Sequence, residues 1–228
     1  MPDKRTIVKL QDKLDEVKAH FKSDPANVAS GDALHGAVAR LTTERAAYRA
    51  LQAGAIAPNI SVRDSGGTTV SLRGLLSKGP IVLVFYRGAW CPYCSVELRA
   101  FEQARPKIEE LGATLVAVSQ QSATFGQQSK RDNELRFPIL VDKLGRVAAA
   151  YGVRWKLPVE LQKVHQLLGA DLSIFNGDSE WTLSMPAKFV IGQDGYIAWS
   201  DVNPDYTARA EPADLFPILR QLARSRER

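Results

Sequence analysis

The feature that most constrains the fold is a buried strand that leads directly into two cysteines at the start of a helix. The strand is expected over 81–86, where β-branched and aromatic residues follow one another without a charge, as in a strand covered on both faces. The helix is expected over 95–111, where apolar residues recur among charged ones at helical spacing. Pro106 lies inside this helix and is expected to kink it. Cys91 and Cys94, the only cysteines of the chain, lie between the two elements.

Strands and helices alternate on both sides of this junction. A hairpin is expected over 59–70, buried strands over 113–119 and 137–141, and a second hairpin over 187–199 around Gln193-Asp194-Gly195. Helices are expected over 72–77, 122–135, 144–151 and 213–226. The segment 154–181 interrupts this alternation with a helix over 159–168 and a loop, a length typical of a functional insertion or a lid. The pattern predicts an α/β fold with βαβ units and a mainly parallel sheet.

The first 53 residues predict a helical extension in front of this domain. One helix is expected over 4–22, where Ile7, Leu10, Leu14, Val17 and Phe21 form one apolar stripe. A second helix is expected from Asp32, a good N-cap, to Gly54, a good residue to follow a helix end. These helices either cover the main domain or form a homodimer. We therefore expect a helical extension at 1–53 and a main domain at 54–228.

Composition and charge exclude several classes of protein. The net charge is +5, but the basic residues are scattered, and the basic tail at 220–228 also contains an acid, so no nucleic-acid partner is expected. The chain has no apolar run of about 18 residues and no signal-peptide core, so no membrane partner is expected. These features predict a cytoplasmic location, where a close cysteine pair is more often catalytic or metal-binding than structural.

The spacing C-x-x-C suits reversible disulfide chemistry. At a helix start it places both sulfurs in the first turn, with Cα atoms within the ~4.4–6.8 Å that a disulfide requires. Free N–H groups and the helix dipole lower the pKa of a thiol at this end. We expect Cys91 to be the more exposed and more acidic thiol, and Arg87 to add positive potential if it turns toward the site.

Three other uses of the cysteine pair were compared with a redox dithiol. A zinc site needs four ligands, and His20, His35 and His165 lack the spacing of a second ligand pair. A c-type haem site needs histidine directly after the second cysteine, where this chain has Ser95. A structural disulfide over so small a loop gains only about 2 kcal/mol in the chain-entropy model. A redox dithiol without metal or cofactor is favoured over the zinc and structural alternatives.

Several segments beyond the cysteines carry a family resemblance: Ala57-Pro58, 82–88, 111–119, 137–142, 148–153 and 189–195. With them, residues 54–222 resemble the peroxiredoxin-like proteins of the alkyl hydroperoxide reductase/thiol-specific antioxidant family, in the thioredoxin-fold superfamily. This resemblance implies a thioredoxin-like fold, with a central mixed sheet flanked by helices, and thiol-dependent reduction of hydroperoxides.

The active-site signature of peroxiredoxins fits this chain only in part. That signature looks like F-Y-P-x-x-x-T-x-x-C-x-x-E, and aligning it on Phe85-Tyr86 implies a peroxidatic cysteine at Cys94 and a glutamate at Glu97. The family's proline then falls on Arg87 and its threonine on Cys91, while its arginine falls near Pro186. We expect Arg87 or Glu97 to point at the sulfur in place of the missing residues.

The same residues also resemble thioredoxin and glutaredoxin. Trp90 to Cys94 is similar to W-C-x-x-C with the glutaredoxin insert Pro92-Tyr93, which implies Cys91 as nucleophile and Cys94 as resolving thiol. Met185-Pro186 resembles the cis-proline that faces the dithiol in that superfamily, the alternative being a trans proline at a strand edge. The buried acid of thioredoxin falls on Phe85 and is absent. Trp90 and Tyr93 are expected to pack and to shape access.

Three functions follow from these resemblances and residues. The first is an antioxidant thiol peroxidase that reduces hydroperoxides and is re-reduced by a thioredoxin- or glutaredoxin-type thiol donor. The second is a thioredoxin-like oxidoreductase that acts on protein disulfides and has little peroxidase activity. The third is a binding module whose cysteine pair is inert. The peroxidase is the prediction, and disulfide exchange is its main alternative.

Overall fold

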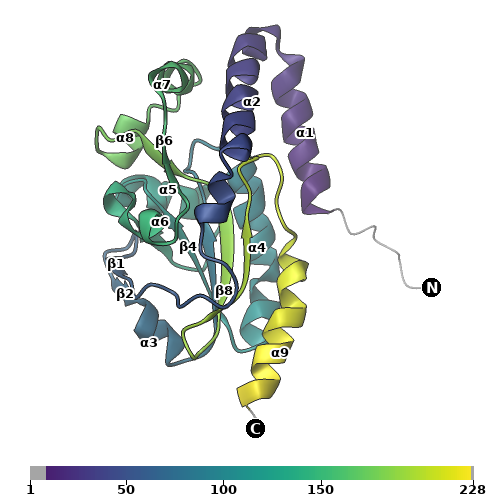
Figure 1. Cartoon of the computed structure of the whole chain (residues 1–228), viewed down its shortest axis with the longest axis vertical. Coiled ribbons are helices and arrows are strands. Elements are labelled where there is room, and N and C mark those ends of the chain that lie inside the picture. Colours follow the sequence, from purple (N-terminus) through teal and green to yellow (C-terminus); the bar gives the residue numbers. More distant parts are fainter. Residues whose placement is uncertain (1–8, 227–228) are drawn as a thin grey trace, which may run out of the picture.

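A computed structural model describes residues 9–226 (Figure 1). Its centre is a five-stranded sheet in the order β5-β4-β3-β8-β9. The strands β3 (Ile81–Phe85), β4 (Thr114–Ser119) and β5 (Ile139–Val141) are parallel, as βαβ connections require. β8 (Ala187–Ile191) and β9 (Ile197–Val202) run antiparallel as the predicted hairpin. The predicted α/β fold with a mixed central sheet is confirmed.

Strand β3 is buried on both faces, which explains its lack of charge. Ile81, Leu83 and Phe85 belong to one apolar core, while Val82 and Val84 belong to the other. The first core is covered by α3 (Leu72–Leu76) and α6 (Arg146–Ala150). The second is covered by α4 (Pro92–Glu110) and α9 (Phe216–Arg226). Helices therefore cover both faces of the sheet.

The other predicted elements are present with some differences at their boundaries, whereas two short strands and one short helix between residues 154 and 184 were not predicted. Helix α4 continues through Pro106 to Glu110, and α9 begins only at Phe216, after a 3₁₀ turn at Pro212–Leu215. Pro217 therefore lies in the first turn of α9, where a missing N–H costs nothing. The other elements are β1 (Ser61–Arg63), β2 (Thr69–Ser71), α5 (Ala123–Asp132), β6 (Arg154–Lys156), α7 (Val159–Leu167), α8 (Leu172–Asn176) and β7 (Thr182–Ser184).

The N-terminal helices are α1 (Leu10–Ser23) and α2 (Val28–Thr43), and part of the first predicted helix lies outside the described residues. The predicted boundaries of the second helix are wrong. A 3₁₀ turn at Pro25–Asn27 leads directly into α2, so the helix begins before Asp32. α2 ends at Thr43, and Arg45 has a left-handed backbone conformation (φ 51°), so that only a short 3₁₀ turn at Ala46–Arg49 follows before Gly54.

Both N-terminal helices pack on the rest of the chain. Leu10 and Leu14 of α1 are buried in the core that contains α4, and Leu34 of α2 is buried with Leu161 of α7. Figure 1 shows the two helices as a pair at one end of the sheet, beside α7. These contacts agree with a cover of the main domain. The homodimer and the division at residue 53 stay predictions. Within residues 9–226, no helix combines the length and apolar character needed to span a membrane.

Candidate functional site

The two cysteines lie where the carboxyl end of β3 meets the first turn of α4. Cys91 is the N-cap of α4, and its carbonyl accepts the backbone N–H groups of Cys94 and Ser95 at 3.0 and 3.1 Å. Pro92 occupies the first helical position, where its fixed φ favours the helix. Both thiols are free. The sequence W-C-P-Y-C therefore begins a helix, with one thiol at the N-cap and the other at the third residue of the first turn.

The turn between β3 and α4 requires glycine. Gly88 has φ +157°, and a Cβ at this position would lie 2.5 Å from Trp90 Nε1. Ala89 N–H donates to Gln121 Oε1 at 2.8 Å, which ties the turn to the end of β4. The Trp90 ring that this turn carries lines the same cavity as Cys91.

Neither thiol has exposed surface, so the predicted greater exposure of Cys91 is wrong. Cys91 and Cys94 are both 0% exposed. The rings of Trp90, Tyr93 and Tyr206 lie around them, and Tyr93 and Tyr206 are in edge contact at 5.4 Å between centroids. The position of the cysteines at a helix start does not predict this burial, because part of the cover comes from the distant loop that carries Tyr206.

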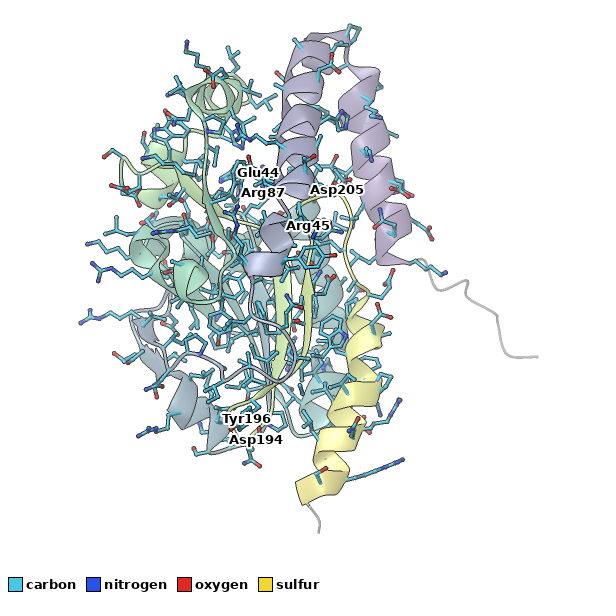
Figure 2. All side chains as sticks on the ribbon, in the orientation of Figure 1. Glu44, Arg45, Arg87, Asp194, Tyr196 and Asp205 are labelled. Carbon is cyan, nitrogen blue, oxygen red and sulfur yellow. The ribbon has the colours of Figure 1, made fainter. Side chains whose placement is uncertain are left out.

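Arg87 turns toward the dithiol, as predicted. Its backbone N–H donates to Cys94 Sγ at 3.4 Å, and its Nη1 donates to Cys91 Sγ at 3.7 Å. The guanidinium carbon lies 4.6 Å from the centroid of Trp90 and 4.3 Å from that of Tyr206, and stacking of this kind stabilises a desolvated cation. Figure 2 shows Arg87 at the end of the sheet near α2, far from Asp194 and Tyr196 at the opposite end.

His165 holds Arg87 in this position and was not predicted to do so. His165 Nε2 lies 3.2 Å from Arg87 Nη2, and its Nδ1 lies 2.9 Å from the carbonyl of Leu161. Because a guanidinium only donates, Nε2 must accept and Nδ1 must carry the proton. Burial, together with the charge of Arg87, lowers the pKa of His165 to about 4, so it stays neutral near pH 7. Sequence reasoning considered this histidine only as a metal ligand.

A loop after β9 supplies two further residues of the site, Tyr206 and Arg209. Asp205 N–H donates to the side chain of Asn203, and Thr207 N–H donates to that of Asp205, both at 2.9 Å. Such side-chain turns shape the loop locally. Gln11 of α1 donates to the Thr207 carbonyl at 3.2 Å and so attaches the loop to the N-terminal helices.

Glu97 takes part in a buried ion network instead of pointing at a sulfur. Its two oxygens lie 3.0 Å from Lys188 Nζ and 3.1 Å from Arg209 Nε, and these three side chains are at most 1% exposed. Lys188 also pairs with Asp201 at 3.0 Å. Glu97 is one turn beyond Cys94 on the sheet-facing side of α4, opposite Lys188 on β8. Of the two side chains expected to point at a sulfur, Arg87 does so, whereas the Glu97 carboxylate is held by these two cations.

The surroundings of the two thiols shift their pKa values in opposite directions. Burial raises the pKa of Cys91, but hydrogen bonding with Cys94 and the positive charges of Arg87 and Arg209 outweigh it and lower the pKa to about 6. Burial and the neighbouring Cys91 raise the pKa of Cys94 well above its usual value. Near pH 7 the site therefore holds a Cys91 thiolate next to a Cys94 thiol. The lower pKa of Cys91 agrees with the prediction.

Met185 and Pro186 lie near Arg87, but their peptide bond is trans. Residues 9–226 contain no cis peptide bond, so the cis-proline prediction is wrong. The trans form is the intrinsically favoured isomer of an X-Pro bond, and here the chain continues from β7 into β8. Both residues share the walls of a small cavity with Arg87 and Tyr206.

Replacement of Arg87 by methionine is expected to raise the pKa of Cys91 by about one unit or more, because it removes the nearest cation. The measurement is the rate of Cys91 alkylation by iodoacetamide against pH, followed by mass spectrometry. In the wild type the rate should rise through about pH 6 and then level off. Arg73→Met, which changes an exposed arginine of α3, is the matched control. The same midpoint in Arg87→Met would contradict the assignment.

Two curated relatives match part of this chain. A thiol-disulfide oxidoreductase ResA from Bacillus thuringiensis subsp. konkukian is 29% identical over 104 residues, 45% of this chain and 59% of ResA. The chloroplastic peroxiredoxin Q of Oryza sativa subsp. japonica is 31% identical over 100 residues, 44% of this chain and 46% of the relative. The chain thus spans about half the length of the curated relatives it matches.

Solved structures share the fold at low sequence identity. The peroxidoxin BcpB of Mycobacterium tuberculosis has a TM-score of 0.59 and 23% identity, over 77% of this chain and 97% of that one. A variant of peroxiredoxin 6 from Arenicola marina has a TM-score of 0.62 and 16% identity, over 78% of this chain and 76% of that one. Residues 53–200, well over half of the chain, match the model of the AhpC/TSA family. The chain therefore belongs to the AhpC/TSA family.

Proposed function

We propose that this chain is a thiol peroxidase that reduces hydroperoxides through Cys91 and Cys94. The observation that carries the proposal is the contact between the Arg87 guanidinium and Cys91 Sγ at 3.7 Å, beside a thiol whose pKa is lowered to about 6. A thiolate is the reactive form toward peroxide, and an adjacent cation stabilises negative charge on the departing oxygen. Membership of the AhpC/TSA family supports the reaction class.

The proposed reaction has three steps. The Cys91 thiolate attacks the terminal peroxide oxygen, the O–O bond breaks, and the departing alkoxide takes a proton, which gives an alcohol and a sulfenic acid at Cys91. The Cys94 thiol then attacks this sulfenic sulfur, and water leaves as the disulfide forms. Two thiols of an external thioredoxin- or glutaredoxin-type donor reduce the disulfide. The reaction needs no metal and no cofactor.

The proposal assigns a role to each surrounding residue. Arg87 stabilises the thiolate and the departing oxygen, and His165 positions Arg87. Arg209 has a buried Nη2 without a hydrogen-bond partner among the described residues, so it offers a second donor near the dithiol. Trp90 and Tyr93 shape access. Glu97 holds Arg209, and Pro92, with Met185 and Pro186, supports the geometry around the thiols.

This assignment makes Cys91 the first thiol to react and Cys94 the resolving thiol. It follows the thioredoxin-like alignment of the motif and not the peroxiredoxin alignment, which would place the peroxidatic thiol at Cys94. Support comes from the opposite pKa shifts of the two thiols. A cytoplasmic location and homodimer formation belong to the proposal as well.

The test compares peroxide consumption by the wild-type chain with that by a free cysteine peptide at the same pH. The expected result is a second-order rate constant at least about 100-fold above that of the peptide. The intact mass of the chain should fall by two hydrogens as the disulfide forms. A rate equal to that of the peptide would contradict the peroxidase proposal.

Disulfide exchange is the second candidate, because the motif Trp90 to Cys94 is similar to that of thioredoxin and the ResA relative is a thiol-disulfide oxidoreductase. In this function, Cys91 attacks a protein disulfide and Cys94 releases the mixed disulfide. The burial of both thiols weighs against direct access by a protein substrate. Fast reduction of insulin disulfides, combined with slow peroxide consumption, would favour this candidate.

A further inference from the structure

Two adjoining cavities lie between the N-terminal helices and the dithiol. The dithiol cavity, of about 320 Å³, has Cys91, Arg87 and Trp90 in its wall. The outer cavity, of about 340 Å³, has Lys18, Lys22 and His35 in its wall. Four residues belong to both walls: Phe21, Asn27, Tyr93 and Tyr206. A ligand that lies along this shared wall contacts both cavities.

The N-terminal helices supply part of the dithiol cavity. Phe21 of α1 and Leu34 of α2 line it, and Asn27 lies between the two helices, with its Nδ2 donating to the Phe21 carbonyl at 3.0 Å. Leu168 and Ala170, which follow α7, line the same cavity. None of the N-terminal residues falls within the segment 53–200 that matches the family model. The N-terminal helices thus add apolar residues to the wall of the dithiol cavity, whereas both cysteines lie in the segment that matches the family model.

The outer cavity carries an excess of positive charge. Lys18 and Lys22 lie four residues apart on one face of α1, and Asp32 is the single acid in this wall. Lys18 Nζ lies 3.4 Å from Thr207 Oγ1, which holds its ammonium group at the cavity. His35 is exposed at the same wall. A carboxylate at the end of an apolar chain could form charge-assisted hydrogen bonds with these two ammonium groups.

We propose that the two cavities bind an organic hydroperoxide with an apolar chain and a terminal carboxylate. The peroxide end lies at Cys91, the hydrocarbon lies along Phe21 and Tyr206, and the carboxylate lies at Lys18 and Lys22. This inference rests on the proposed peroxidase function and names its substrate class.

A binding experiment tests the cavity without any turnover. Decanoate and decanol, which differ only in the charged end, are titrated by calorimetry into the full chain carrying Cys91→Ser. Decanoate is expected to bind more tightly than decanol. In a variant with Lys18→Gln and Lys22→Gln, decanoate should bind roughly tenfold more weakly, about threefold for each partly exposed ion pair, while decanol is unaffected. Phe21→Ala should weaken both ligands.

The matched control is Lys13→Gln, which removes one positive charge from α1 at a residue outside both cavity walls and is compared with Lys22→Gln alone. It should leave decanoate binding unchanged. Equal binding of decanoate and decanol, or no binding of either, would overturn the proposal. An equal loss in the Lys13 variant would also overturn it, because the effect would then come from net charge.

A kinetic experiment separates this inference from the proposed function. The wild-type chain should reduce 10-hydroperoxydecanoate with a higher kcat/KM than decyl hydroperoxide, and the double lysine variant should lose that preference. If both hydroperoxides are reduced rapidly and equally, the carboxylate site is wrong while the peroxidase function stands. If decanoate binds as expected but no hydroperoxide reacts faster than with a cysteine peptide, the proposed function is wrong and the hydroperoxide assignment falls with it.

Discussion

Replacement of Cys91 by serine is expected to lower the rate of peroxide consumption by roughly 1000-fold or more, because it removes the nucleophile. Replacement of Cys94 by serine should have a different effect. The Cys91 thiolate still attacks peroxide, so the first turnover remains, but the sulfenic acid cannot be resolved within the chain. Steady turnover with a dithiol reductant is then expected to fall, while a sulfenic acid accumulates at Cys91.

Stopped-flow consumption of hydrogen peroxide and mass spectrometry of dimedone adducts measure these two effects. Ser95→Ala is the matched control, because it alters the neighbouring side chain and keeps both sulfurs and the backbone hydrogen bond to Cys91. Its rate should equal that of the wild type. A fast, peroxide-dependent adduct at Cys94 in the Cys91→Ser variant would reverse the assignment and favour the peroxiredoxin alignment of the motif.

The part of the site that could be predicted from sequence lies within one continuous segment. The buried strand, the C-x-x-C helix start and Arg87 are neighbours in the chain, so strand and helix periodicity places them together. The hairpin of β8 and β9 was predictable for the same reason, since its turn residues are local. Local rules fail at α2, where the preceding 3₁₀ turn sets the start of the helix.

The rest of the site depends on packing between distant segments. His165 reaches Arg87 from the 154–181 insertion, and Arg209 reaches Glu97 from a loop more than a hundred residues away. No local pattern marks either residue. One signal was present in the sequence: Lys188 lies in the predicted strand at 187–191, and a lysine inside a buried strand needs an acidic partner. Glu97 is one such partner, and Asp201 is the other.

Replacement of Glu97 by glutamine is expected to lower the free energy of unfolding by about 3–5 kcal/mol, which is typical when one partner of a buried ion pair is removed. The glutamine keeps the size of the side chain but leaves Arg209 without its carboxylate and Lys188 with Asp201 alone. Urea unfolding followed by tryptophan fluorescence measures the change. Glu109→Gln on the same helix is the matched control, since its exposed pair with Arg105 should contribute less than about 1 kcal/mol.

A second substitution distinguishes loss of charge pairing from loss of packing. Arg209→Met, added to Glu97→Gln, removes the buried cation that the first substitution leaves without its carboxylate. If unpaired charge causes the instability, the double variant should recover part of the lost free energy, although it carries two core substitutions instead of one. If packing causes it, the two losses should add. A cost below about 1 kcal/mol for Glu97→Gln alone would show that the network contributes no more than a surface ion pair.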